Sequence, residues 1–152
     1  MILLASGRRD IVAFYSKWLL RRIEEGFVDV RNPYDPHQLS RIYLNEQSVD
    51  VLVFCTKNPL PILPYIKQIP FPMLFHVTLT PYHKEIEQLP SKKEILKAIR
   101  FLAKQLGKEH VVVRYDPIFL SDTYTLEYHR KAFQRLCEPV SYTHLDVYKR
   151  QD

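Results

Sequence analysis

The chain has 152 residues, a hydrophobic content of 46% and a formal net charge of +5 at pH 7, so it is long and apolar enough for one globular domain. Its two cysteines are too few for a disulfide framework or a closed zinc site, and no apolar run reaches the length of a membrane span. The positive charge favours anionic partners, either nucleic acid or a small anionic ligand. The first residues do not have the pattern of a signal peptide, so we expect a cytoplasmic protein with no membrane partner.

Short runs of β-branched residues predict buried strands, and apolar residues at helical spacing predict helices between them. The expected elements are a strand at 1–5, a helix between Asp10 and Gly26, a strand at 27–30, an optional returning strand at 38–44, a strand at 49–55, a helix at 61–69, a strand at 73–80, a helix at 91–107, a strand at 111–115 and a helix at 125–137. This alternation predicts an α/β fold with a parallel sheet. The five strands of the series are too few for a closed eight-stranded barrel.

Polar and charged residues follow the predicted strands directly. Ligands of α/β folds bind beyond the carboxyl ends of the strands, so these residues are candidates for a site that binds a small anionic ligand. We assign catalytic roles to Asp10, Lys57 and Asp116. We assign ligand-binding roles to Arg8, Arg31, Asn32, Thr56, Asn58 and Arg114.

Arg114 and Asp116 alternate about Tyr115, so both side chains can lie on the same side of the strand. In the functional interpretation, Arg114 binds a carboxylate or phosphate with its guanidinium fork, and Asp116 orients it or accepts a proton. In the structural interpretation, the two residues form a buried ion pair. The sequence leaves both interpretations open.

Three further candidates, Asp10, Lys57 and Asn58, also have a structural alternative. Asp10 is either a catalytic carboxylate or the cap of the following helix. Lys57 stabilises developing negative charge or is a solvated loop residue, and Asn58 binds a ligand or shapes the turn before a proline. Arg8 precedes the helix predicted between Asp10 and Gly26, and the free backbone N–H groups at the start of that helix favour an anion.

The histidines and the lysine-rich helix give weaker indications. His76 and His83 do not have the spacing of a metal motif, and a packing role is expected for His129, so we predict no metal site in this chain. The basic residues of the helix at 91–107 are the best candidates for contacts with nucleic acid, although a solvated helix face is the favoured interpretation. These basic residues are Lys92, Lys93, Lys97, Arg100 and Lys104.

The last residues depart from the preceding pattern. Residues 139–152 lack the apolar alternation of a further strand and resemble a translated sequencing adapter. We therefore expect residues 1–138 to be the amino-terminal part of a barrel-like domain and 139–152 to be a non-native tail.

Several blocks of sequence resemble, in order, a bacterial family of unknown function that is numbered 1848 among such domains. The blocks are A-S-G-R-R-D-I-V-A-F-Y-S-K-W, G-F-V-D-V-R-N-P, V-F-C-T-K-N-P, H-V-V-V-R-Y-D-P and Y-T-L-E-Y-H. The first block departs from the family's usual S-R-R-T-D, and Cys55 stands where the family usually has tryptophan. We therefore do not expect Cys55 to be a required nucleophile.

The resemblance implies an incomplete (β/α) TIM-like barrel of the radical S-adenosylmethionine type. Members carry a C-x3-C-x2-C cluster in a later region, so the resemblance implies an iron–sulfur cluster and S-adenosylmethionine in a longer parent protein and no cofactor in this chain. An enzyme fragment that binds an anionic substrate or cofactor is the first hypothesis. A non-catalytic module that binds nucleic acid or another polyanion is the alternative.

Overall fold

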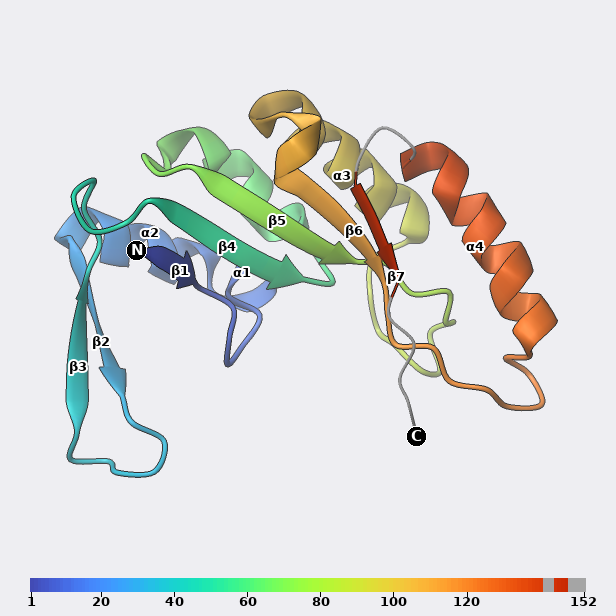
Figure 1. Ribbon diagram of the computed structural model, residues 1–152, viewed down its shortest axis with the longest axis horizontal. Helices are drawn as coiled ribbons and strands as arrows, with labels where there is room; N and C mark the ends of the chain where they lie inside the picture. Colours follow the sequence, from blue (N-terminus) through green and yellow to red (C-terminus); the bar gives the residue numbers. More distant parts are fainter. Residues whose placement is uncertain (141–143, 148–152) are drawn as a thin grey trace.

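The computed structural model describes residues 1–140 and 144–147 of the chain. Its centre is a sheet of five strands in the order β1-β4-β5-β6-β7, and every neighbouring pair is parallel (Figure 1). The strands are β1 Ile2–Leu4, β4 Val51–Thr56, β5 Met73–Thr78, β6 Val111–Tyr115 and β7 His144–Val147. The predicted α/β fold with a parallel sheet is therefore confirmed. The described strands form an open sheet with β1 and β7 at its edges, not a closed barrel.

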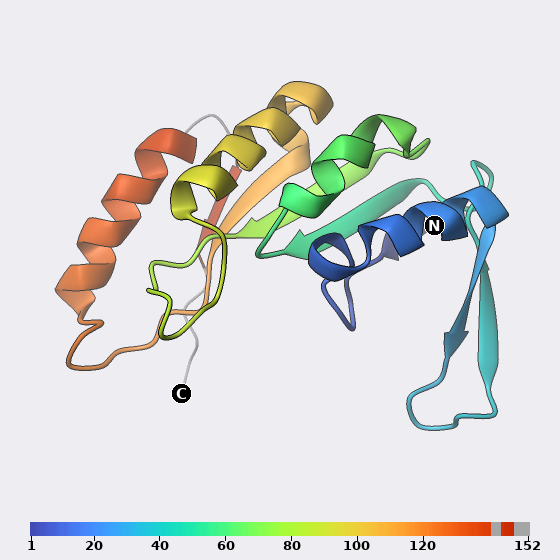
Figure 2. The same ribbon diagram turned by 180° about the vertical axis from the view of Figure 1, so that it is seen from behind.

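The helices cover one face of this sheet. They lie behind the sheet in Figure 1 and in front of it in Figure 2, where the view is reversed. They are α1 Ile11–Phe14, α2 Ser16–Glu25, η1 Leu60–Gln68, α3 Lys92–Leu106, η2 Lys108–His110 and α4 Leu126–Val140. No helix in the described part of the chain is long and apolar enough to cross a membrane.

The ends of two helices confirm particular sequence predictions. Gly26 ends α2 with φ 80°, a left-handed conformation that glycine adopts without steric cost. Ser91 and Glu94 form the predicted capping box at the start of α3, each side chain accepting a hydrogen bond from the other residue's backbone.

The strand predicted at 27–30 does not belong to the central sheet. It forms β2, Phe27–Arg31, which pairs antiparallel with β3, Leu39–Tyr43, in a separate two-stranded hairpin. Its inclusion in the parallel series was therefore wrong, whereas the optional returning strand is present. The two strands hydrogen-bond to each other, and Arg41 forms an ion pair with Asp29 while stacking over the Phe27 ring.

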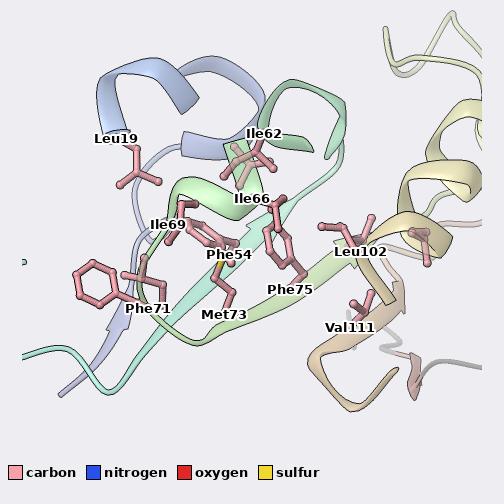
Figure 3. Packing of buried hydrophobic residues seen from close by; sticks show 14 of the residues in the cluster. Leu19, Phe54, Ile62, Ile66, Ile69, Phe71, Met73, Phe75, Leu102 and Val111 are labelled. Atoms are coloured by element: carbon pink, nitrogen blue, oxygen red, sulfur yellow. The ribbon is translucent and has the colours of Figure 1, made fainter. Parts of the chain in front are cut away.

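The apolar core lies between the sheet and the helices. Inward-facing side chains of β4 and β5 meet those of η1 and α3, as the close-up in Figure 3 shows. Phe54 and Phe75 are fully buried at its centre, with ring centroids 4.9 Å apart.

The last helix and strand extend beyond the predicted elements. Helix α4 continues to the fully buried Val140, past its predicted end at Cys137, and includes Pro139 in its last turn. Strand β7 pairs with β6 and lies within the segment assigned to a non-native tail. The non-native origin of 139–152 stays a prediction.

Replacing Phe54 with alanine is expected to lower the free energy of unfolding by about 3–5 kcal/mol, because a large buried side chain is lost and a cavity remains. Phe14, which is 77% exposed, provides the matched control. Phe14→Ala should change the free energy by less than about 0.5 kcal/mol. Chemical denaturation followed by circular dichroism measures both variants, and equal losses would contradict the assigned core.

Candidate functional site

The sheet has a second face that the helices leave open. Residues of the central strands alternate between full burial against the helices and partial exposure on this open face. Along each strand the open face begins apolar and ends polar. The apolar positions are Val51, Val53, Leu74 and Val112, and the polar ones are Cys55, His76, Thr78 and Arg114. The polar positions lie toward the carboxyl ends of β4, β5 and β6, where ligands of parallel sheets bind.

Arg114 and Asp116 form an ion pair at this end of the open face. The Arg114 Nη2 lies 3.1 Å from Asp116 Oδ2, and the two side chains are 26% and 29% exposed. The guanidinium is thus held in place while remaining accessible from solvent. This geometry suits the binding of an anion that also contacts the fork of the guanidinium.

Cys55 lies near both Arg114 and Asp10. Burial raises the pKa of the Cys55 thiol, and the charge of Asp10 adds to this rise while the charge of Arg114 opposes it. The net effect keeps the thiol protonated at neutral pH, which does not favour a nucleophile. The cysteine therefore contributes a neutral side chain near the two charged ones.

Asp10 connects the carboxyl end of β1 to that of β4. Its Oδ1 accepts a hydrogen bond from the Ala13 backbone N–H at 2.9 Å and so caps α1. Its Oδ2 accepts from the Thr56 hydroxyl at 2.8 Å and from the Lys57 backbone N–H at 3.2 Å. This carboxylate therefore has a clear structural task as cap and crosslink.

Thr56 and Asn58 shape the turn that follows β4. The Asn58 backbone N–H donates to the Thr56 hydroxyl at 3.0 Å, and the Leu60 N–H donates to Asn58 Oδ1 at 3.2 Å. Thr56 is buried beneath this turn. The turn interpretation of Asn58 thus has direct geometric support.

Lys57 belongs to a polar network that joins the loops after β4 and β5. Its ammonium pairs with Glu87, whose other carboxylate oxygen accepts from the Thr80 hydroxyl. Lys92 Nζ donates to the same hydroxyl at 3.3 Å. The sequence analysis did not propose Thr80, Glu87 or Lys92 as site residues. Thr80 follows a strand end and could have been included on that ground, whereas Glu87 lies in an irregular loop without a recognisable motif.

The network shifts the ionisation of two of its members. Burial alone would raise the pKa of the Glu87 carboxyl, but hydrogen bonds from Lys57 and Thr80 and the charges of Lys57 and Lys92 lower it overall. Burial, together with the Lys57 charge, lowers the pKa of Lys92, and the Glu87 charge only partly opposes this. Glu87 therefore stays ionised at neutral pH, beside a half-buried amine.

The remaining predicted binding residues lie at the hairpin. Arg8 Nη1 donates to the Arg31 carbonyl at 2.7 Å, which joins the loop after β1 to the end of β2. Asn32 Oδ1 accepts from the Tyr34 N–H at 2.9 Å within the hairpin loop, and the Asn32 amide contacts Gln38. Because β2 stands outside the central sheet, Arg31 and Asn32 do not follow one of its parallel strands, and the contact with Arg8 is what links Arg31 to the loop after β1.

No group of three or more His, Cys, Asp or Glu side chains within residues 1–140 is arranged to hold a metal ion. The two free cysteines, Cys55 and Cys137, lie on β4 and α4. These residues do not fit an iron–sulfur cluster, which needs several cysteine thiolates converging on one point.

Replacing Asp10 with alanine is expected to lower the free energy of unfolding by about 1–2 kcal/mol, because α1 loses its cap and the turn after β4 loses two acceptor contacts. Asp122→Ala, at an exposed loop position, provides the matched control and should have little effect. Chemical denaturation measures both. Equal stability of Asp10→Ala and the parent chain would contradict the structural role of this carboxylate.

The lowered pKa of Glu87 predicts a pH-dependent contribution to stability. Its ionised form stabilises the fold above the ordinary value of 4.5, and this contribution is lost as the pH falls through the folded-state pKa. Glu87→Gln should therefore be less stable than the parent chain at pH 7, and the difference should narrow under acid conditions. Denaturation midpoints between pH 7 and pH 3 test this, with the exposed Glu46→Gln as control. A difference that does not depend on pH would contradict the lowered pKa.

A family model matches almost the whole chain. The family is described as Domain of unknown function (DUF1848), and its model matches residues 2–148, including β7. No curated protein and no solved structure matches the chain. The family that the sequence blocks suggested is thus confirmed, and the chain belongs to the DUF1848 family.

Proposed function

We propose that the chain is part of a barrel-type enzyme that binds an anionic small molecule on the open face of its sheet. The observation that carries the proposal is the polar end of this otherwise apolar face, where Arg114, paired with Asp116, lies near Cys55. A cation that is held by a carboxylate and remains partly accessible suits an anionic ligand.

The course of the chain supports the barrel interpretation. Apart from the hairpin, the strands follow one another across the sheet in sequence order, and all are parallel. The helices lie on one face only, as the two opposite views show (Figures 1 and 2). A doubly wound sheet reverses its strand order and carries helices on both faces, whereas a (β/α) barrel winds in one direction and encloses the opposite face. Additional strands beyond β1 and β7 would enclose the open face.

The residues at the carboxyl end have separable tasks in this proposal. Arg114 binds the carboxylate or phosphate of the ligand, and Asp116 holds the guanidinium and can accept a proton from a bound substrate. Lys57 provides positive charge beside the site, although its pairing with Glu87 makes it a positioning residue in this arrangement. Asp10 secures the two strand ends against each other.

The iron–sulfur cluster and S-adenosylmethionine implied by the resemblance remain expectations for a longer parent protein. The described residues do not fit the cluster, so no chemical step of this chain is assigned to it. The carboxylate of S-adenosylmethionine is nevertheless the kind of group that the Arg114 guanidinium could bind.

Binding of nucleic acid or another polyanion remains the second hypothesis. Lys92 contacts Thr80 and is half-buried, so it contributes little to an exposed basic face on α3. The remaining four basic residues of α3 are exposed, namely Lys93, Lys97, Arg100 and Lys104. A steep loss of DNA binding with increasing salt would support this hypothesis.

The proposed role of Arg114 can be tested by titrating S-adenosylmethionine into the protein. Arg114→Gln should weaken binding by about tenfold or more, because a charge-assisted hydrogen bond is lost. Arg21→Gln, which removes the same charge from the exposed side of α2, should bind like the parent chain. Saturable binding that is unchanged in Arg114→Gln would contradict the role of Arg114.

A further inference from the structure

A cavity of about 440 Å³ lies between α3 and α4, near the carboxyl end of β5. It is separate from the open face of the sheet, because α3 and α4 cover the opposite face (Figure 2). Its size is within the range of about 300–1,000 Å³ that is usual for small-molecule sites. The network around Glu87 reaches it only through Thr80 and Lys92.

Three cationic side chains from two helices line the cavity. Lys92 comes from the first turn of α3, and Lys131 and Arg135 come from successive turns of α4. None of the described residues that line it is acidic. Lys131 contacts Glu127 at 3.4 Å, but both side chains are largely exposed, so this ion pair neutralises the local charge only weakly. The cavity is therefore a concentration of positive charge.

Lys92 is directed inward, although it begins an amphipathic surface helix. Its ammonium donates to the fully buried Thr80 hydroxyl at 3.3 Å. Half-burial beside a second lysine disfavours its charged form and lowers its pKa. An anion in the cavity would favour the charged form of Lys92 and so raise its pKa, because it provides a nearby negative charge.

Part of the cavity lining is apolar and held in place. The Tyr128 hydroxyl donates to the Pro81 carbonyl at 2.7 Å, which fixes the ring at the cavity wall. Ala132 and Leu136 of α4 also line the cavity. An aromatic ring and aliphatic side chains beside a cluster of cations suit a ligand with an anionic end and a flat organic body.

We propose that the cavity between α3 and α4 binds a small phosphate monoester, with the phosphate on Lys92, Lys131 and Arg135 and the organic group against Tyr128. Arginine and lysine together offer the forked and point-like donors that phosphate accepts. This site is independent of the anion site proposed at Arg114, so either can fail without the other.

The proposal predicts saturable binding of adenosine 5′-monophosphate by calorimetry, weaker binding of inorganic phosphate and no measurable binding of adenosine. Arg135→Gln and Lys131→Gln should each weaken binding of the monophosphate by about tenfold, as expected for the loss of a charge-assisted hydrogen bond. Arg130→Gln is the matched control, because Arg130 is an exposed arginine of the same helix that does not line the cavity. Circular dichroism confirms that the variants are folded.

A second measurement locates the ligand without any substitution. Acetic anhydride should acetylate Lys92 several times more slowly in the presence of the monophosphate, whereas the exposed Lys93 should react at the same rate, as followed by mass spectrometry. Three results would each overturn the proposal: absence of saturable binding, equal weakening by Arg130→Gln and Arg135→Gln, or no protection of Lys92. Unchanged binding in Arg114→Gln would at the same time separate this site from the one on the open face.

Discussion

The carboxylate of Asp10 is the contact on which the carboxyl edge of the sheet depends. It accepts hydrogen bonds from the start of α1, from the Thr56 hydroxyl and from the Lys57 backbone. These three donors come from two segments, the start of α1 and the end of β4, that are adjacent in space but distant along the chain. The contact therefore fixes the direction in which the chain leaves β4, and with it the position of Lys57 beside Glu87. The loops after β4 and β5 are joined by this ion pair, so one capping residue influences the geometry of two further loops.

The sheet itself separates structural tasks from functional ones. Its covered face is packed with apolar side chains from strands and helices. Replacing a large side chain there with a small one leaves a cavity and lowers the free energy of unfolding. Its open face is apolar at the start of the strands and polar at their ends. An apolar surface of this kind needs a partner, and enclosure by further strands would place the polar ends in a site with little water. Charge interactions at Arg114 and Asp116 would then be stronger than in the exposed arrangement.

The central strands and the amphipathic helices were predictable because each carries its own pattern. The run from Val51 to Cys55 predicts a buried strand, and the capping box at Ser91 predicts the start of α3. The pairing of β2 was not predictable in this way, because a short strand does not specify its partner. Arg31 and Asn32 consequently follow a strand of the hairpin and not a strand of the central sheet, and Arg31 contacts the loop after β1 only through its carbonyl.

The residues of the candidate site also differ in whether a local sequence pattern identifies them. The rule that polar residues follow buried strands correctly brought Asp10, Thr56 and Lys57 together. It did not identify Glu87, which lies in a loop without periodicity and is brought to Lys57 only by the fold. Lys92 was expected on a solvated helix face, but its position in the first turn lets its long side chain reach back to Thr80. Such contacts depend on the spacing between elements, which a single sequence does not encode in any local pattern.

Lys92 also has a thermodynamic consequence, because its ammonium lies between two environments. The negative charge of the Glu87 carboxylate attracts this ammonium, and the Lys92 side chain also lines the cavity between α3 and α4. A negative charge entering the cavity would compete with Glu87 for this ammonium and alter the strength of the Lys57–Glu87 pair. Linkage is reciprocal, so a change in the strength of the Lys57–Glu87 pair would in turn alter the affinity of the cavity for an anion. With an anion bound in the cavity, Lys92 would thus couple the helical layer to the Lys57–Glu87 pair at the loops after β4 and β5.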